Sequence, residues 1–355
     1  MKQEPTTEPE SESPARKAFA ATTVVIAVVV GALALWKLRA VLALLFMAVT
    51  VAAAMRPGVE WLAARRIPRP VGVLLHYLAL LGLLALFLSF VVPHLISQVE
   101  AALASTKGHH HTGGVKGQIL DAIQRRLQHL PSAGKLLHPA LSIGMTAFKI
   151  VIGIFFTFAS AAYWLFERDQ AVDLLASLIA RPKRKKLRDT IYLIDLKLGA
   201  FVRGQLLLIA LVSTAASLGL WAVGEPYFLL VGIAVGILEI VPVIGPLAAI
   251  LLAAGAGLTT GWHTAVYAVA VLLLIRLLED YLITPRVLGG VVGLSPLIVL
   301  ISVSATGILL GGFYVLLAIP TASVLVTLID VLVRGIDPAE TDVPTVLFPA
   351  KDTDT

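Results

Sequence analysis

Residues 71–92 read VGVLLHYLALLGLLALFLSFVV and contain no Asp, Glu, Lys or Arg. As an α-helix this stretch is about 33 Å long, which matches the ~30 Å hydrocarbon core of a bilayer. Similar apolar stretches recur along the chain, each bounded by charge, proline or tryptophan. The sequence therefore predicts a chain that crosses a membrane several times as helices.

The composition of the whole chain agrees with this prediction. Of its 355 residues, 58% are hydrophobic and 14% are charged, and the mean hydropathy is +0.91. Soluble domains contain about 25% charged residues, so we expect the lipid bilayer to be a partner of this chain. The formal net charge of +6 comes largely from Lys and Arg beside apolar stretches, a pattern of membrane orientation that argues against a nucleic-acid partner. The absence of cysteine excludes disulfides and thiolate chemistry, and we expect no cofactor.

Ten apolar segments are candidates for membrane helices. Six stand alone, at residues 19–36, 40–55, 71–92, 150–166, 204–223 and 262–278. Four shorter ones form two pairs, 227–241 with 247–259 and 297–310 with 313–333. Short segments broken by Gly or Pro are typical of discontinuous or re-entrant helices. We therefore predict an all-α integral membrane protein, a polytopic helical bundle of about eight spans with short broken or re-entrant helix pairs.

The distribution of Lys and Arg predicts the orientation. Most of the 28 basic residues fall on the inner side if the N-terminus is cytoplasmic. This predicts a multi-pass protein of the cell inner (plasma) membrane with both termini in the cytoplasm.

Five regions follow from the same pattern. We expect a disordered tail at 1–17, transmembrane helices at 18–93, an extracytoplasmic amphipathic helical segment at 94–143, a transmembrane transport core at 144–335 and a flexible tail at 336–355. The candidate functional residues lie in the predicted transport core, residues 144–335. Within the third, the apolar residues at 119, 120, 123, 127 and 130 follow helical spacing.

The stretch EIVPVIGP at residues 239–246 predicts a break inside an apolar region. Pro242 and Pro246, with Gly245 between them, cannot continue one straight helix, because each proline lacks an N–H and clashes with the preceding turn. In transporters such breaks line the substrate path. Glu239 lies just before the break, and two interpretations stay open: a proton-coupling or cation-binding carboxylate, or an interfacial glutamate at a helix end.

Two further polar stretches could serve transport. Arg203, Gly204 and Gln205 begin an apolar helix and could bind an anionic or polyhydroxyl solute. The favoured interpretation is that Arg203 only extends its guanidinium to the polar membrane interface. Arg276 can pair with Glu279 and Asp280, which favours ordinary helix-surface pairing over an inner gate. Three consecutive histidines at 109–111 indicate incidental metal affinity, so we predict no metal site.

Several of these stretches together resemble a known family. GAFVRGQ at 199–205, IVPVIGP at 240–246, Glu279 with Pro285, and Pro296 followed by AIP at 318–320 are similar to the autoinducer-2 exporter family of bacterial permeases. The resemblance covers about residues 57–333. It implies a multi-helix permease that exports autoinducer-2-like furanones in some members and exchanges sodium or lithium for protons in others, and it implies a homo-oligomer. Glu239 stands where many relatives carry a neutral polar residue, which favours ion coupling.

The function predicted from the sequence is secondary transport, with export of a small polar solute such as an autoinducer-2-like signal. A sodium (lithium)/proton antiporter is the alternative, so the expected ligands are a small polar solute, a monovalent cation or a proton. A non-transporting membrane scaffold that recruits a partner through its outer amphipathic segment is the second alternative. An enzyme is not expected, because nucleotide-binding loops and nucleophile motifs are absent from the sequence. The residues expected to line or gate the transport path are Arg203, Gly204, Gln205, Glu239, Pro242, Gly245, Pro246, Arg276, Glu279, Asp280, Pro285 and Pro320.

Overall fold

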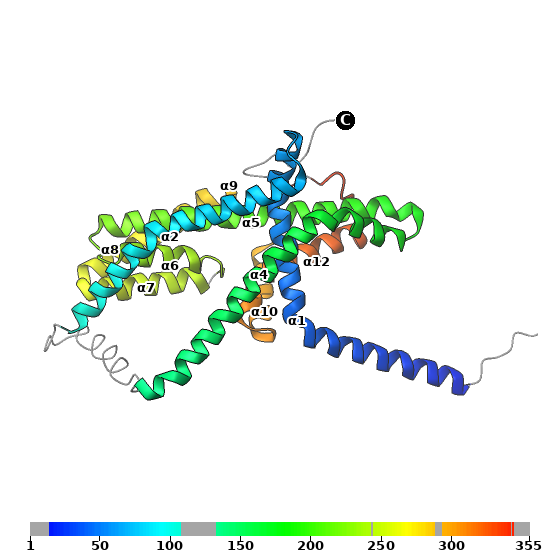
Figure 1. Ribbon diagram of the computed structural model, residues 1–355, viewed down its shortest axis with the longest axis horizontal. Coiled ribbons are helices and arrows are strands. Elements are labelled where there is room, and N and C mark those ends of the chain that lie inside the picture. Colours follow the sequence, from blue (N-terminus) through cyan, green and yellow to red (C-terminus); the bar gives the residue numbers. More distant parts are fainter. Residues whose placement is uncertain (1–13, 108–132, 243, 288–292, 342, 344–355) are drawn as a thin grey trace, which may run out of the picture. The chain divides into compact units, whose positions relative to one another are not determined.

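The computed structural model describes residues 14–107, 133–242, 244–287, 293–341 and 343 (Figure 1). Within these residues the regular structure is entirely helical, as predicted. The chain divides into two compact units, residues 1–46 and residues 47–355, and the second contains most of the helices and every site described below.

The first helix, α1 (Pro14–Ala64), is continuous over the two segments 19–36 and 40–55 that the sequence separates. The prediction of two helices here was wrong. Lys37 and Arg39 interrupt the apolar pattern, but Lys, Leu and Arg are good helix formers and no Gly or Pro lies between the two segments. Charge alone therefore interrupts the hydropathy without ending the helix.

Among the described residues, four helical stretches are long and apolar enough to cross a membrane, by length and composition. They belong to α1, α2 (Arg69–Lys107), α4 (Ala133–Ser177) and α5 (Arg184–Ala222), the last preceded by a 3-10 turn at Arg181–Lys183. Large apolar side chains on them are exposed, among them Leu83 and Phe155. Such exposure is what a lipid-facing surface requires.

The predicted extracytoplasmic segment 94–143 is only partly described. Helix α2 runs into it as far as Lys107, and α4 starts within it at Ala133. The amphipathic helix predicted at 119–130 and the histidines at 109–111 lie outside the described residues.

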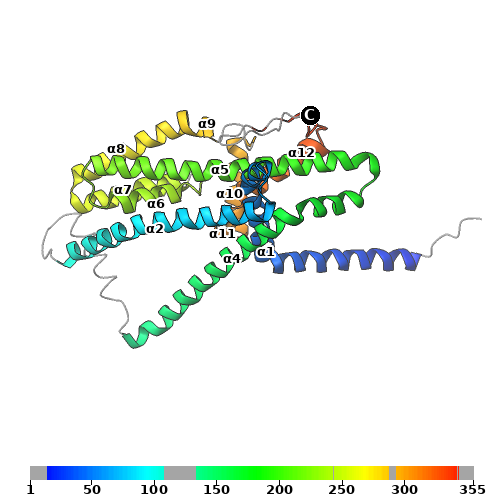
Figure 2. The ribbon, with the colours of Figure 1, turned by 45° about the horizontal axis from the view of Figure 1, so that its top comes forward.

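Among the described residues, a bundle of four helical segments encloses a large cluster of buried apolar side chains. The second half of α5 packs with α6 (Phe228–Leu238), α7 (Ile244–Thr260) and α8 (Trp262–Leu278), which lie alongside it in Figure 2. The interior contains small and branched residues: Val212, Ala216, Leu220, Val235, Ala249, Ala253, Ala268 and Leu272. Small residues let helix backbones approach closely. Gly232 shows this, because a Cβ there would lie 2.6 Å from the backbone nitrogen of Ser217.

The break predicted at residues 239–246 is confirmed. Helix α6 ends at Leu238 and α7 begins at Ile244, and turn hydrogen bonds from Ile240 N to Ile237 O and from Val241 N to Leu238 O lie between them. The two prolines and Gly245 thus divide an apolar stretch into a helical hairpin. This hairpin is the short broken pair that the sequence predicted.

The C-terminal part continues from α8 through a π-helical turn, Glu279–Ile283, into α9 (Thr284–Val287). Pro285 offers no N–H to the preceding turn, and the helix widens just before it. Helices α10 (Pro296–Leu309), α11 (Gly312–Val315) and α12 (Ala318–Leu332) follow, so the segment predicted at 313–333 is divided in two.

Helix α12 packs on α10 and on α5. Beyond it, Val343 is buried against Leu193 and Ala200 of α5. This residue of the predicted flexible tail 336–355 is therefore part of the folded structure, because its apolar side chain packs against α5.

Candidate transport site

A cavity of about 520 Å³ lies where α5, the α6–α7 break, the end of α8 and the C-terminal helices meet. Its size is in the range of small-molecule binding sites. The lining residues are Phe201, Gln205, Leu208, Glu239, Pro242, Pro246, Arg276, Glu279, Asp280, Thr284, Gly293, Leu294, Val299 and Ile319. Most of these side chains are apolar, and the polar ones gather at the break and the end of α8.

Three carboxylates surround one guanidinium in this cavity. Arg276 Nη1 lies 3.1 Å from Glu279 Oε2 and 3.6 Å from Glu239 Oε2, and Arg276 Nη2 lies 3.0 Å from Asp280 Oδ1. Glu239 and Glu279 are buried, whereas Asp280 is exposed. With three negative groups and one positive group, this acidic cluster has a formal charge of −2 when ionised. A buried excess of negative charge favours binding of a cation or a proton.

Gln205 fixes the position of the break. Its Nε2 donates a hydrogen bond to the backbone oxygen of Glu239 at 3.2 Å. That carbonyl lies where α6 ends, and carbonyls at a helix end lack intrahelical partners. The side chain of α5 therefore stabilises the interrupted backbone beside the acidic cluster.

A second, much smaller cavity of about 20 Å³ adjoins the acidic cluster. Glu239, Pro246, Arg276 and Glu279 line both cavities. The remaining walls of the small cavity are apolar residues of the four-helix bundle, including Val212 and Leu272. It is large enough for one water molecule. The acidic cluster thus lies between the large cavity and the apolar interior of the bundle.

A model of the AI-2E family transporter group matches residues 24–334. The chain belongs to the AI-2E transporter family. The resemblance indicated by residues 199–205 and 240–246 is confirmed, and the protein is a membrane transporter.

Relatives of this transporter occur in several bacteria. It is 23% identical over 285 residues to YrrI of Bacillus subtilis, covering 76% of this chain and 80% of the relative. It is 27% identical over 313 residues to MT0215 of Mycobacterium tuberculosis, covering 84% and 85%. A third relative, sll0063 of Synechocystis, is 29% identical over 212 residues, covering 59% and 51%. Their names assign all three provisionally to transport and mention no solute.

The transporter brings together seven of the twelve path residues predicted from the sequence. These seven line the large cavity: Gln205, Glu239, Pro242, Pro246, Arg276, Glu279 and Asp280. The favoured interpretation of Arg276 as an ordinary surface pair was incomplete, because the fold adds Glu239 to its partners. Glu239 is buried and lines the cavity, and its role as a coupling carboxylate stays a prediction.

The other five predicted path residues are absent from the cavity lining: Arg203, Gly204, Gly245, Pro285 and Pro320. Arg203 Nη1 instead donates to the backbone oxygen of Ala54 at 3.1 Å, so it fastens α5 to α1. Gly204 is buried in α5. Gly245 packs against the backbone of Leu238 and lets the break close tightly. Pro320 is buried in the first turn of α12, where a missing N–H costs little.

Seven lining residues, chiefly apolar ones, are absent from the twelve path residues expected from the sequence. Phe201 and Leu208 lie four residues before and three residues after Gln205, so helical spacing from Gln205 was the signal that could have found them. Ile319 is the neighbour of the predicted Pro320. Thr284, Gly293, Leu294 and Val299 complete this set, and their convergence depends on tertiary packing.

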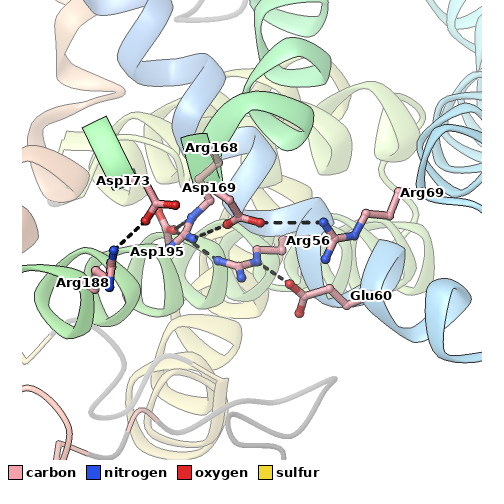
Figure 3. A network of polar contacts seen from close by, with 8 residues as sticks. All are labelled: Arg56, Glu60, Arg69, Arg168, Asp169, Asp173, Arg188 and Asp195. Carbon is pink, nitrogen blue, oxygen red and sulfur yellow. Dashed lines mark hydrogen bonds and ion pairs between the residues drawn. The ribbon is translucent and has the colours of Figure 1, made fainter. Parts of the chain in front are cut away.

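The transporter also contains an ion-pair network that no sequence pattern indicated (Figure 3). Its centre is Asp195 of α5, which accepts from Arg168 Nε of α4 at 2.5 Å and lies 3.5 Å from Arg56 Nη1 of α1. Three further contacts extend it along α1 and α4 and to α2: Arg56 with Glu60, Arg168 with Asp169 and Arg69 with Asp169. Arg188 of α5 and Asp173 of α4 form a separate exposed pair. Three arginines balance three carboxylates in the network, which favours a structural role.

Proposed function

We propose that this transporter exports a small polar solute, such as an autoinducer-2-like furanone, by secondary transport across the inner (plasma) membrane. The observation that carries the proposal is the 520 Å³ cavity at the α6–α7 break, with buried Glu239 and Glu279 in its wall. Broken helices supply polar backbone groups inside a membrane only where they line a cavity. Cytoplasmic termini and assembly as a homo-oligomer belong to the same proposal.

The acidic cluster would couple transport to an ion gradient. Two buried carboxylates share one guanidinium with exposed Asp280, so a proton or a monovalent cation can compensate the remaining negative charge. Occupancy of the cluster would then alter the polarity of the cavity next to the solute. The energy for export would come from that ion gradient.

A sodium (lithium)/proton antiporter is the second candidate function. The same observation supports it, since an acidic cluster beside a cavity the size of one water molecule can bind a small ion without any organic solute. In this case the large cavity would be an aqueous entrance to the cluster.

Flux in vesicles reconstituted with the purified full chain tests the proposal. Efflux of labelled autoinducer-2 and sodium/proton exchange would be measured with and without an imposed proton gradient. We expect gradient-dependent flux that Glu239→Gln lowers at least tenfold and that loses its pH dependence. Glu167→Gln is the matched control, because Glu167 is exposed on α4 and is absent from the cavity lining.

Each outcome separates the candidates. Efflux of the signal molecule supports export, and ion exchange alone supports antiport. Wild-type vesicles that show neither flux contradict the proposal, as does a Glu239→Gln variant whose flux keeps the wild-type pH dependence. Deletion of residues 118–130, which lie outside the described structure, tests the scaffold alternative: a scaffold should lose its partner, whereas a transporter should keep its flux.

A further inference from the structure

A further cavity, of about 260 Å³, lies at the N-terminal end of α5, where the chain that follows α12 packs beside it. We call it the charged cavity. Its walls include Lys185, Lys186 and Asp189 of α5, and Gly335, Asp337 and Ala339 of the chain after α12. It shares no lining residue with the transport cavity. Its volume admits a small molecule, not merely a single water molecule.

Four charged side chains line the charged cavity, two of each sign. Lys185 and Lys186 are positive, and Asp189 and Asp337 are negative. Among the described residues none of these four belongs to an ion pair, whereas Arg188 of the same helix forms a 2.9 Å pair with α4. The cavity thus offers separate positive and negative groups that a ligand with both charges can bind.

One wall of the charged cavity belongs to a C-terminal strap, defined here as residues 335–341 and 343. Asp337 shapes the strap, because its Oδ1 accepts from Ala339 N at 2.9 Å and its backbone oxygen accepts from Thr341 Oγ1 at 3.1 Å. Further along, Val343 is 4% exposed and packs in an apolar cluster with Ile319, which lines the transport cavity. The strap therefore connects the charged cavity with the wall of the transport cavity.

We propose that the charged cavity is a regulatory binding site for a small zwitterion, a molecule with an anionic phosphate group and a cationic amine. The two lysines bind the phosphate oxygens, and the two aspartates bind the amine. Such a ligand contacts α5 and the strap together, so its binding favours the state in which the strap lies against α5. Phosphoethanolamine has this chemistry, both as a free molecule and as the headgroup of a phospholipid.

Calorimetric titration of the full chain in phosphatidylglycerol nanodiscs tests the site. The probes are phosphoethanolamine, inorganic phosphate and ethanolamine. Phosphoethanolamine should bind about tenfold more tightly than either part alone, because its two charged groups bind as one molecule. Replacing both lysines, Lys185→Met with Lys186→Met, should weaken phosphoethanolamine and phosphate about tenfold or more. Asp189→Asn should weaken phosphoethanolamine severalfold and leave phosphate as tight as before or tighter.

Lys183→Met is the matched control for the loss of positive charge. Lys183 is exposed, lies two residues before Lys185 and is absent from the cavity lining. Its replacement should leave all three affinities unchanged. Lys185 and Lys186 are exposed as well, so their variants should fold, and monodisperse elution checks this.

A thiol probe reports the position of the strap. The chain contains no cysteine, so Val343→Cys introduces a single thiol at a buried position. Phosphoethanolamine should slow alkylation of this thiol severalfold. The slowing should disappear when Lys185→Met and Lys186→Met are added. An alkylation rate that ignores the probe, while the probe still binds, overturns the regulatory role.

The binding data can overturn the site itself. No binding of phosphoethanolamine to the wild type, wild-type affinity in the double lysine variant or an equal loss in Lys183→Met each does so. Phosphate binding as tight as phosphoethanolamine binding overturns the zwitterion assignment. Nanodiscs of phosphatidylethanolamine separate the two sources: a lower apparent affinity for the soluble probe identifies the lipid headgroup as the ligand, and an unchanged affinity identifies a free molecule. None of these measurements depends on flux, so failure of the proposed export leaves them intact.

Discussion

At the scale of single residues, the position of each carboxylate determines what it can do. Glu239 and Glu279 share Arg276 and border the cavity, so their charge is partly compensated and accessible to an ion. Glu225, in the turn between α5 and α6, is different. It is 2% exposed, its Oε1 accepts from Tyr227 N at 3.4 Å, and its Oε2 has no partner among the described residues. The ionised carboxylate of Glu225 therefore lowers the stability of the folded state, and it is absent from the cavity lining.

The buried position of Glu225 predicts a pH dependence of stability. Burial raises the pKa of Glu225 above its ordinary value, and the hydrogen bond from Tyr227 N offsets this only in part. The folded state therefore favours the protonated carboxyl of Glu225. The resulting contribution to the free energy of unfolding is fully present below the ordinary carboxyl pKa, and it is lost as pH rises through the raised pKa of the folded state. Glu225→Gln should raise the melting temperature at pH 7 and above, with little effect in acid.

Thermal unfolding of the detergent-solubilised protein across pH measures this effect. The Glu225→Gln variant should show a flatter stability profile than the wild type above the ordinary carboxyl range. Glu60→Gln, at a half-exposed position, serves as the control for removing one negative charge. Parallel profiles for wild type and Glu225→Gln would contradict the assignment of an ionisation cost to this residue.

At the scale of helices, glycine positions determine how closely the elements approach. The four-helix bundle depends on α6 lying directly against α5, and Gly232 faces the backbone of Ser217 there. Gly255 of α7 has nothing within 4 Å of its potential Cβ. Both glycines lie within helices. At Gly232 a neighbouring backbone occupies the space where a Cβ would lie, whereas at Gly255 this space is empty.

Gly232→Ala should therefore separate α5 from α6. A Cβ at 2.6 Å from Ser217 N meets backbone, which cannot rotate away, so we expect a loss of about 2 kcal/mol in stability from overpacking. Gly255→Ala should be neutral or slightly stabilising, because it removes freedom from the unfolded chain without a clash. Thermal unfolding of both variants measures the difference. Equal melting temperatures would show that α6 is free to shift.

The same scale shows what the sequence could predict and what it could not. The break at residues 239–246 was predictable because Pro and Gly act on their own backbone within one turn. The partner of Arg203 was not, since Ala54 O lies 149 positions away in the chain and a backbone carbonyl has no sequence signal. For the same reason Asp195, 139 positions from Arg56, was passed over among the other charges of residues 168–203. Local conformation is encoded locally, whereas pairing between helices depends on packing.

At the scale of the larger unit, residues 47–355, helix α5 connects all the polar assemblies. Asp195 belongs to the ion-pair network, Gln205 to the cavity and Val212 to the bundle interior. From Asp195 to Gln205 the helix rises about 15 Å. A shift of α5 would therefore move residues of the ion-pair network and of the cavity wall together.

This connection predicts that the network supports transport from a distance. The side chain of Asp195 is only 7% exposed. Asp195→Asn keeps its shape, but Arg168 and Arg56 lose the carboxylate that they share. Removing one partner of a buried pair costs about 3 kcal/mol, so thermal stability should fall clearly. Flux should fall as well, because α1 and α4 no longer hold α5 in place.

Asp173→Asn is the matched control for this prediction. Asp173 pairs with Arg188 at 2.9 Å between the same two helices, α4 and α5, but both side chains are exposed and such pairs are worth little. Its melting temperature and flux should stay close to the wild type. If Asp195→Asn behaves like Asp173→Asn, then apolar packing alone positions α5, and Asp195 is a tolerated charge. If adding Arg168→Met to Asp195→Asn restores stability without restoring flux, the network positions the transport path as well as holding the fold.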